Sequence, residues 1–127
     1  MTLAVAGIDP RIKVAVAHVP FLCDVRAAAR THNSLVKQLL DTAGCNNEAA
    51  LHTLDYSDPL QLAPNLRAPA LISAGGKDDV CPMATIRAVF DRIPGVKSLA
   101  VYPDSTHTSC AAFYDMSWSW LDFYLRR

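Results

Sequence analysis

APALISAGGKDDVCPMATIRAVFDRIPGVKSLAVYPDSTH, residues 68–107, is the stretch that decides the fold of this chain. It opens with a short apolar run over residues 68–74, typical of a buried strand, and closes with the run over 97–103, which is expected to form another strand. Between the two runs, four apolar residues recur at helical spacing: Ile86, Val89, Phe90 and Ile93. Pro82 fits the first turn of that helix, and Pro94-Gly95 ends it. The order strand, helix, strand predicts two neighbouring parallel strands joined by a right-handed crossover.

The same alternation continues toward both ends of the chain. Residues 13–20 (KVAVAHVP) form a third apolar run, and an apolar helix before it ends at Gly7-Ile-Asp-Pro10. Residues from about 25 to 54 are expected to be helical, with Gly44 as a plausible stop. A last helix over about 111–125 is expected to place four side chains on one face: Phe113, Met116, Trp120 and Tyr124. We therefore expect an α/β fold in which helices flank a parallel sheet.

Length and composition indicate one domain, or one part of a larger domain, over residues 1–127, with a helical insert at about 25–54. The chain is 51% hydrophobic and 19% charged, which is typical of a globular protein. Its 12 basic and 12 acidic residues cancel, so no charge pattern indicates binding to nucleic acid or to a membrane surface. No stretch approaches the roughly 20 apolar residues of a membrane span.

The four cysteines form no C-x-x-C pair and match no zinc-binding spacing. Reduced thiols in a cytoplasmic protein are the expectation, although sequence alone leaves a disulfide open. The N-terminus has no basic segment followed by a long apolar run, so it does not resemble a secretion signal.

Two polar loops follow the strands of residues 68–107. One holds Asp78 and Asp79, and the other holds His107. Because the carboxyl ends of parallel strands meet at one edge of a sheet, we expect these loops to lie side by side. A carboxylate that holds an imidazole is the acid–base half of a hydrolase triad, and the order acid then histidine is that of α/β-hydrolases.

The nucleophile of such a triad has no counterpart here. None of the serines stands in a Gly-x-Ser-x-Gly elbow, and Ser73 falls within the strand predicted over residues 68–74. The chain opens inside a helix, so the elbow is expected just upstream of Met1. We accordingly expect the isolated chain to be inactive as an esterase.

Three segments together resemble the acetyl xylan esterase and cephalosporin-C deacetylase family, carbohydrate esterase family 7. They are LAVAGIDPRIKVAVAHVPFLCD over residues 3–24, LHTLDYSDPLQLAPNLRAPALISAGGKDDVCP over 51–82 and KSLAVYPDSTH over 97–107. Each piece alone is a weak signal, whereas their order is specific. The resemblance covers roughly the last two-fifths of a family enzyme, the C-terminal portion of an α/β-hydrolase fold.

This resemblance implies a serine carboxylesterase that deacetylates acetylated oligosaccharides and related small acetyl esters. It assigns the triad acid to Asp78 rather than Asp79, and the triad base to His107. It also implies no metal or organic cofactor, ring-like homo-oligomers and an intracellular location. Three features depart from the family pattern: His18 and Thr108 replace acidic residues, and the insert over residues 25–51 matches weakly.

Several residues have simpler interpretations. His107 could be an ordinary loop histidine, and Asp79 is the better candidate to cap the helix that begins near Pro82. Cys81 or Cys110 could pair with a histidine as a nucleophile, but neither stands on a strand-to-helix elbow.

The remaining histidines and aromatic residues have structural interpretations. His18 is expected to be a core or rim residue, and His32 and His52 to be solvated. The aromatic residues near the C-terminus are expected to pack the last helix rather than to bind sugar: Trp118, Trp120, Phe123 and Tyr124.

Two alternative functions remain open at this stage. The chain could be a non-catalytic binding or assembly module that uses the uncovered edge of the strand over residues 13–20. It could also be part of another α/β-hydrolase, of the dienelactone hydrolase or peptidase type.

Overall fold

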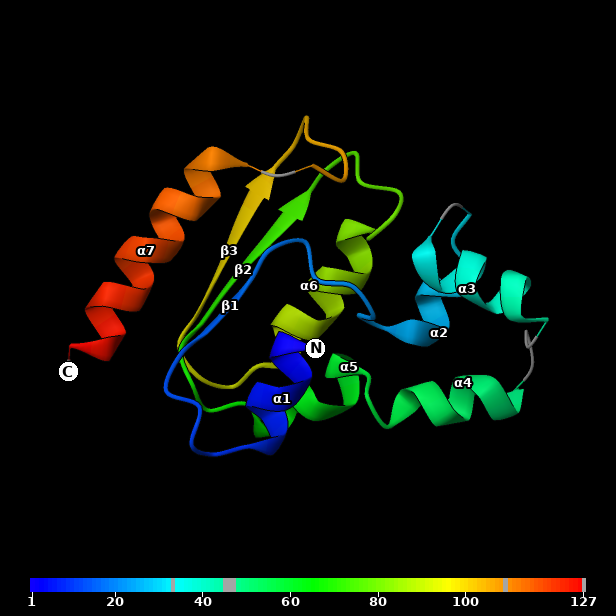
Figure 1. Cartoon of the computed structure of the whole chain (residues 1–127), viewed down its shortest axis with the longest axis horizontal. Helices are drawn as coiled ribbons and strands as arrows, with labels where there is room; N and C mark the ends of the chain where they lie inside the picture. The colour runs from blue at the N-terminus through cyan, green and yellow to red at the C-terminus, as the bar shows by residue number, and fades with distance from the viewer. Residues whose placement is uncertain (33, 45–47, 109, 127) are drawn as a thin grey trace.

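The computed structural model describes residues 1–32, 34–44, 48–108 and 110–126. Its centre is a parallel sheet with the strand order β1-β2-β3 (Figure 1). The strands are β1 (Ala15–Ala17), β2 (Ala70–Gly75) and β3 (Lys97–Tyr102). The register pairs Ala70 with Lys97 and Gly75 with Tyr102, so β2 and β3 end side by side. The predicted crossover between two parallel neighbours is confirmed, whereas β1 is shorter than the run over residues 13–20 suggested.

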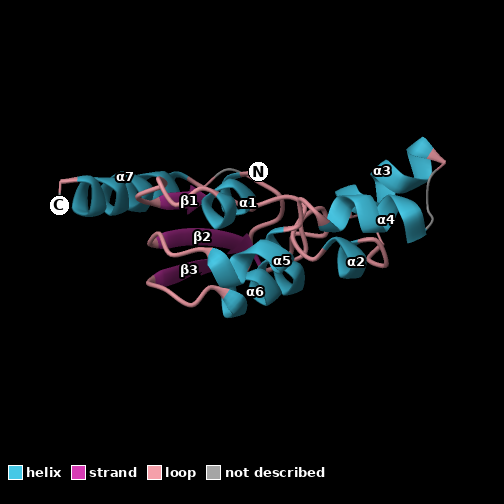
Figure 2. Cartoon of the chain, turned by 90° about the horizontal axis from the view of Figure 1, so that it is seen from below, coloured by secondary structure: helices cyan, strands magenta, loops and turns pink. Residues whose placement is uncertain are grey.

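Helices cover both faces of this sheet. Their bounds are α1 (Thr2–Ile8), α2 (Val25–Ala28), α3 (Leu35–Ala43), α4 (Glu48–Asp55), α5 (Pro59–Leu62), η1 (Ala63–Asn65), α6 (Met83–Arg92) and α7 (Ala111–Leu125). Helix α7 lies on one face, while α1, α5 and α6 lie on the other (Figures 1 and 2). The expected α/β architecture is therefore confirmed. Among the described residues, no helix is both long and apolar enough to cross a membrane.

Strand β2 forms the centre of the core, and all six of its residues are buried. Ile72 packs in one cluster with Leu3 of α1 and with Ile86 and Val89 of α6, and none of these four side chains is more than 2% exposed. Burial on both faces explains why β2 is a continuous apolar run rather than an alternating one. The core thus fixes the strand that carries the loop with Asp78.

The insert contains three helices. Helices α2, α3 and α4 project away from the sheet around a small core of their own that includes Val25, Val36 and Leu40 (Figure 2). Ser34 separates α2 from α3, because its buried hydroxyl donates to the carbonyl of Ala28 and accepts from an N–H in the first turn of α3. The expected stop at Gly44 is confirmed, since Gly44 ends α3 with a φ of 62°.

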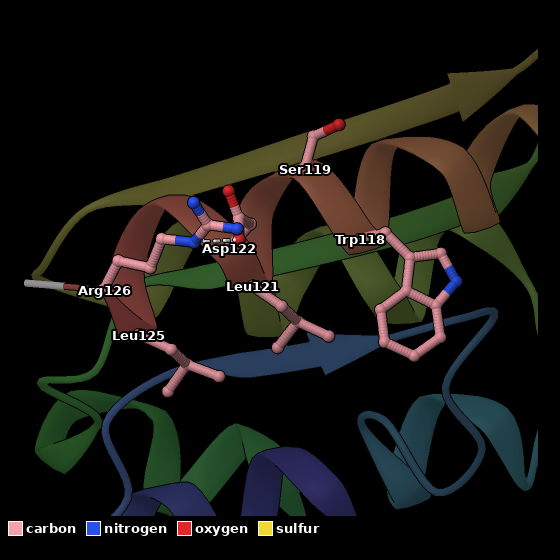
Figure 3. Close-up of a pocket in the computed structure, with 6 residues that line it drawn as sticks. All are labelled: Trp118, Ser119, Leu121, Asp122, Leu125 and Arg126. Carbon is pink, nitrogen blue, oxygen red and sulfur yellow. Dashed lines mark ion pairs between the residues drawn. The ribbon is translucent and has the colours of Figure 1, made fainter.

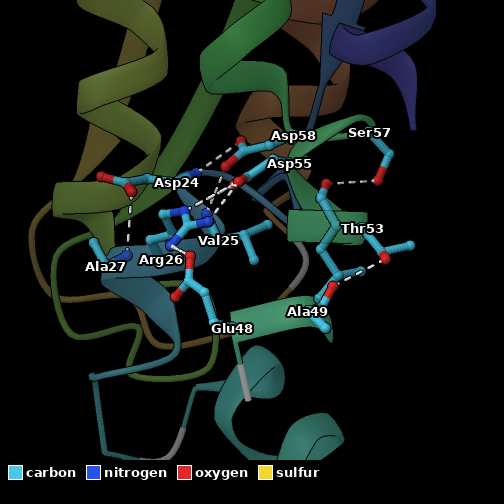
Figure 4. A network of polar contacts seen from close by, with 11 residues as sticks. Asp24, Val25, Arg26, Ala27, Glu48, Ala49, Thr53, Asp55, Ser57 and Asp58 are labelled. Carbon is cyan, nitrogen blue, oxygen red and sulfur yellow. Dashed lines mark hydrogen bonds and ion pairs between the residues drawn. The ribbon is translucent and has the colours of Figure 1, made fainter. Parts of the chain in front are cut away.

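Asp58 joins the insert to the rest of the fold. Its carboxylate is 1% exposed and accepts three backbone N–H bonds, from Asp24 at 3.1 Å, Val25 at 2.7 Å and Leu60 at 2.8 Å (Figure 4). The sequence Ser57-Asp58-Pro59 indicates a turn but does not reveal these contacts. This side chain caps α5 and also fixes the backbone at the start of α2.

The buried face of α7 differs from the expectation. Phe113 and Ser117 are buried, whereas Met116 is 41% exposed. Trp118 and Phe123 are 72% and 50% exposed, so the interpretation of these two residues as packing is wrong. The helix is apolar around most of its circumference, and its sequence pattern therefore does not define one inward face.

Candidate active site

The loop after β2 holds Asp78 in a fixed orientation. The Asp78 side chain has no exposed surface, and its Oδ1 accepts the N–H groups of Val80 at 3.0 Å and Cys81 at 2.8 Å. Its second oxygen, Oδ2, lies 2.9 Å from Nδ1 of His107. The two backbone bonds to Oδ1 leave Oδ2 to face the imidazole.

The loop after β3 holds His107. Main-chain hydrogen bonds tie this loop to the one before it: Gly76 N–H donates to Tyr102 O, and Lys77 N–H donates to Ser105 O, both at 2.9 Å. The His107 side chain is 38% exposed, in contrast to its buried partner Asp78. The structure therefore brings together the two residues that the sequence analysis selected, one enclosed and one open to solvent.

The pair has the chemistry of a proton acceptor held by a carboxylate. An ionised Asp78 can only accept hydrogen bonds, so the ring proton of neutral His107 is assigned to Nδ1. Nε2 is then left with a free lone pair. Such an imidazole can take a proton from a hydroxyl nucleophile placed beside Nε2, and the carboxylate stabilises the imidazolium that forms.

Two glycines allow the loops to lie this close. A Cβ on Gly75 would be 2.7 Å from the carbonyl oxygen of Ser105, and one on Gly76 would be 2.4 Å from that of Pro103. Both neighbours are backbone atoms, which cannot move aside as a flexible side chain could. Glycine at these positions is therefore required by the contact between the two loops.

Gly76→Ala is expected to destabilise the chain by about 1–3 kcal/mol, the usual cost of overpacking. Urea unfolding followed by circular dichroism measures this free energy. The matched control is Lys77→Ala, because the exposed Lys77–Asp104 ion pair contributes only about 0–1 kcal/mol. A Gly76→Ala variant as stable as the wild type would contradict the close approach of the two loops.

The neighbouring residues have other placements. Asp79 does not cap the following helix, because Pro82 takes the N-cap position of α6 and offers no side-chain hydrogen bond. The thiol of Cys81 is 4% exposed, and burial first, then the charge of Asp78, raises its pKa to about 12. This thiol is therefore a poor nucleophile. Cys110 lies at the N-cap of α7.

Asp78, Cys81 and His107 also offer oxygen, sulfur and nitrogen atoms within 4.8 Å of one another. That spacing would suit a three-ligand metal site. The hydrogen bond between Asp78 and His107 is the arrangement of a proton-transfer pair.

One polar pair, His18 and Ser73, was not predicted from the sequence. Nδ1 of His18 lies 2.6 Å from Oγ of Ser73 in β2. A serine inside an otherwise apolar buried strand was the available signal, but its partner is 55 residues away in the sequence. As expected, His32 and His52 are exposed.

A hollow of about 560 Å³ lies along α7, toward the end of the helix far from the β2 and β3 loops (Figures 1 and 3). Its lining residues are Trp118, Ser119, Leu121, Asp122, Leu125 and Arg126. The hollow is mostly apolar in character and is separate from the Asp78–His107 pair.

Three described cysteines are free: Cys23 and Cys81 are buried, and Cys110 is partly exposed. This agrees with the expectation of reduced thiols for these three. Cys45 lies outside the described residues.

Comparisons with known proteins agree with this geometry. A family model described as acetyl xylan esterase (AXE1) matches residues 1–123. The acetyl esterase Axe7A of Xylanibacter ruminicola is 29% identical over 126 residues, which cover 93% of this chain and 27% of that protein. Thus the chain spans about a quarter of the length of this curated relative.

Two solved structures have the same fold. The acetyl xylan esterase from Paenibacillus sp. R4 superposes with a TM-score of 0.85 at 28% identity, covering 97% of this chain and 41% of that one. Acetyl xylan esterase 1 from Thermoanaerobacterium sp. JW/SL YS485 gives a TM-score of 0.82 at 27% identity, with 96% and 41% covered.

Proposed function

Because this chain belongs to the acetyl xylan esterase family, we propose that it carries the acid and the base of a serine carboxylesterase acting on acetylated carbohydrates. The observation that supports the proposal is the 2.9 Å contact between Oδ2 of the buried Asp78 side chain and Nδ1 of the partly exposed His107 side chain. Asp78 is the triad acid and His107 the triad base. The membership also favours this enzyme class over the dienelactone hydrolase and peptidase types.

In this proposal the two residues move one proton during each half of the reaction. Nε2 of His107 takes the proton from a serine hydroxyl as its oxygen attacks the acetyl carbonyl carbon. The imidazolium, held by Asp78, then gives that proton to the sugar oxygen as the ester C–O bond breaks, and the acetyl group stays on the serine. In the second half, His107 takes a proton from water as the water oxygen attacks the acetyl carbon, and it returns this proton to the serine oxygen as acetate leaves. The 127 residues contain no Gly-x-Ser-x-Gly elbow, so the serine would come from polypeptide outside this sequence.

The substrate class rests on the relatives. Their names describe an acetyl esterase and acetyl xylan esterases, and the chain covers 27% of the first and 41% of each solved structure. We therefore propose small acetyl esters, with acetylated oligosaccharides as the natural class. No group in the proposed reaction of Asp78 and His107 requires a metal or an organic cofactor.

The isolated chain is expected to show no turnover of p-nitrophenyl acetate above the background hydrolysis rate. Without a serine nucleophile and its oxyanion hole, an acid–base pair has no covalent step to assist. Release of p-nitrophenol, followed by absorbance, measures the rate. His107→Ala is the control: turnover that disappears in this variant would show that the chain carries its own nucleophile.

A second candidate function is assembly without catalysis. Among the described residues, β1 pairs only with β2, so the other edge of this strand is uncovered, and α7 exposes Trp118 and Phe123. An open strand edge beside apolar surface favours association with another chain, including a second copy of this one. Size-exclusion chromatography distinguishes the cases: a monomer that unfolds cooperatively would count against an assembly role.

A further inference from the structure

His18 stands at the end of β1 and joins it to the buried strand β2. Its Nδ1 lies 2.6 Å from Ser73 Oγ, and the same oxygen accepts the N–H of Val19 at 3.0 Å. Ser73 is 0% exposed. The Ser73 hydroxyl can donate its proton to Nδ1 of His18 or accept a proton from Nδ1, so this contact holds the ring in either neutral tautomer.

The other side of the His18 ring faces the polypeptide that carries His107. The ring stacks on Phe113 at a centroid distance of 4.9 Å and an interplanar angle of 20°, and it also contacts Tyr114 at 5.5 Å. Both aromatic residues belong to the first turn of α7, directly after the loop with His107. The His18 ring therefore lies between β2 and the start of α7.

The pKa of His18 is affected by burial and by the loop that carries His107. Burial lowers the pKa of His18, the backbone of Thr108 raises it, and the charge of His107 lowers it again. Nε2 of His18 is buried and has no hydrogen-bond partner among the described residues.

The backbone next to His18 is strained. Val19 has a φ of 36°, a conformation that β-branched residues avoid and that costs about 1–3 kcal/mol. The bond from its N–H to Ser73 holds it there. A strained conformation of this kind persists only where the surrounding contacts hold it. Here these contacts fix the backbone next to His18, and with it the position of the His18 ring.

We propose that His18 is a positioning residue for His107. Together with Ser73 it forms a support that runs from buried β2 to Phe113 in the first turn of α7, directly after the loop with His107, and this support holds the His107 ring against Asp78. The inference rests on the proposed function, since it describes how the base of that site is held. A direct catalytic role for the Ser73–His18 pair does not fit, because Ser73 is fully buried and cannot meet a substrate.

Nuclear magnetic resonance of the four histidine rings in this chain tests the proposal. Nitrogen-15 shifts report which ring nitrogen of His107 is protonated, and the proton on Nδ1 gives a low-field signal while it is hydrogen-bonded to Asp78. His18→Phe keeps the stacking on Phe113 but removes both ring nitrogens. In the His18→Phe variant we expect the low-field signal of His107 to disappear and both neutral tautomers of the His107 ring to be populated.

Three further variants make the result decisive. Ser73→Ala, which removes the other end of the support, should have the same effect, and His18→Asn, which restores a polar atom near Ser73, should return part of the signal. His52→Phe, at an exposed histidine in the insert, should leave the signal unchanged. If His18→Phe does not fold, Ser73→Ala decides in the same way.

An unchanged His107 signal in folded His18→Phe or in folded Ser73→Ala overturns the proposal, and so does a loss that His18→Asn does not reverse. The measurement reports the geometry of the ring and not turnover. Failure of the esterase proposal would appear as an inactive assembled enzyme with this signal intact, so the two failures are distinguishable.

Discussion

Asp78→Asn is expected to lower kcat of an assembled esterase by about 10⁴-fold with little change in KM, as removal of the carboxylate does in hydrolase triads. The N–H groups of Val80 and Cys81 need an acceptor, so they fix the amide oxygen of the new side chain on their side. The amide NH₂ then faces Nδ1 of His107. Two donors cannot pair, and His107 adopts the tautomer with its proton on Nε2, which cannot accept a proton from serine.

The assembled enzyme for this test is a chimaera. In it, residues 1–127 replace the matching portion of the acetyl xylan esterase from Paenibacillus sp. R4, whose fold superposes with a TM-score of 0.85. Asp79→Asn is the matched control, because it removes the same charge one residue away and is expected to change kcat less than about threefold, as surface changes do. Equal losses in the two variants would contradict the assignment of the acid to Asp78.

Asp58→Ala is expected to lower the free energy of unfolding by about 3–5 kcal/mol, because it leaves three backbone N–H groups without an acceptor. Burial raises the pKa of the Asp58 carboxyl, and the N–H bonds from Leu60, Val25 and Asp24 act against that rise. Removing this carboxylate from water is unfavourable, and the three N–H bonds offset that cost. A domain of this size has about 5–15 kcal/mol of stability in total, so the loss is severe.

Urea unfolding of Asp58→Ala, with Asp55→Asn as control, measures this effect. Asp55 belongs to the same polar network but is 23% exposed, and its partner Arg26 also pairs with Glu48 (Figure 4). Its substitution is expected to cost about 1 kcal/mol or less. If the two variants lose equal stability, Asp58 is not the residue that joins the insert to the sheet.

Local sequence patterns predicted the part of the fold that carries the candidate site. β2, α6 and β3 follow from short apolar runs with turn residues between them, and the shared edge of β2 and β3 brings Asp78 to His107. Each of these inferences depends on neighbours in sequence or on the general geometry of parallel sheets.

The features that the sequence did not predict depend on contacts between distant residues. Helix α2 is separate from α3 because Ser34 bonds to the backbone of Ala28, and Asp58 fixes the start of α2 by accepting the N–H of Val25. The His18–Ser73 pair joins residues on different strands. The face of α7 that packs against the sheet is set by tertiary contacts. Because α7 is apolar around most of its circumference, its sequence does not indicate which face that is.

Turnover of p-nitrophenyl acetate by the folded chimaera, with His107 intact and with His107→Ala, tests the central claim most directly. If Asp78 and His107 are the acid and base of the esterase, the intact chimaera turns over many equivalents of substrate. His107→Ala then lowers kcat/KM by about 10⁴-fold or more while circular dichroism shows both proteins folded. A folded chimaera whose turnover is the same with and without His107 would contradict the claim, and so would a folded chimaera with no turnover.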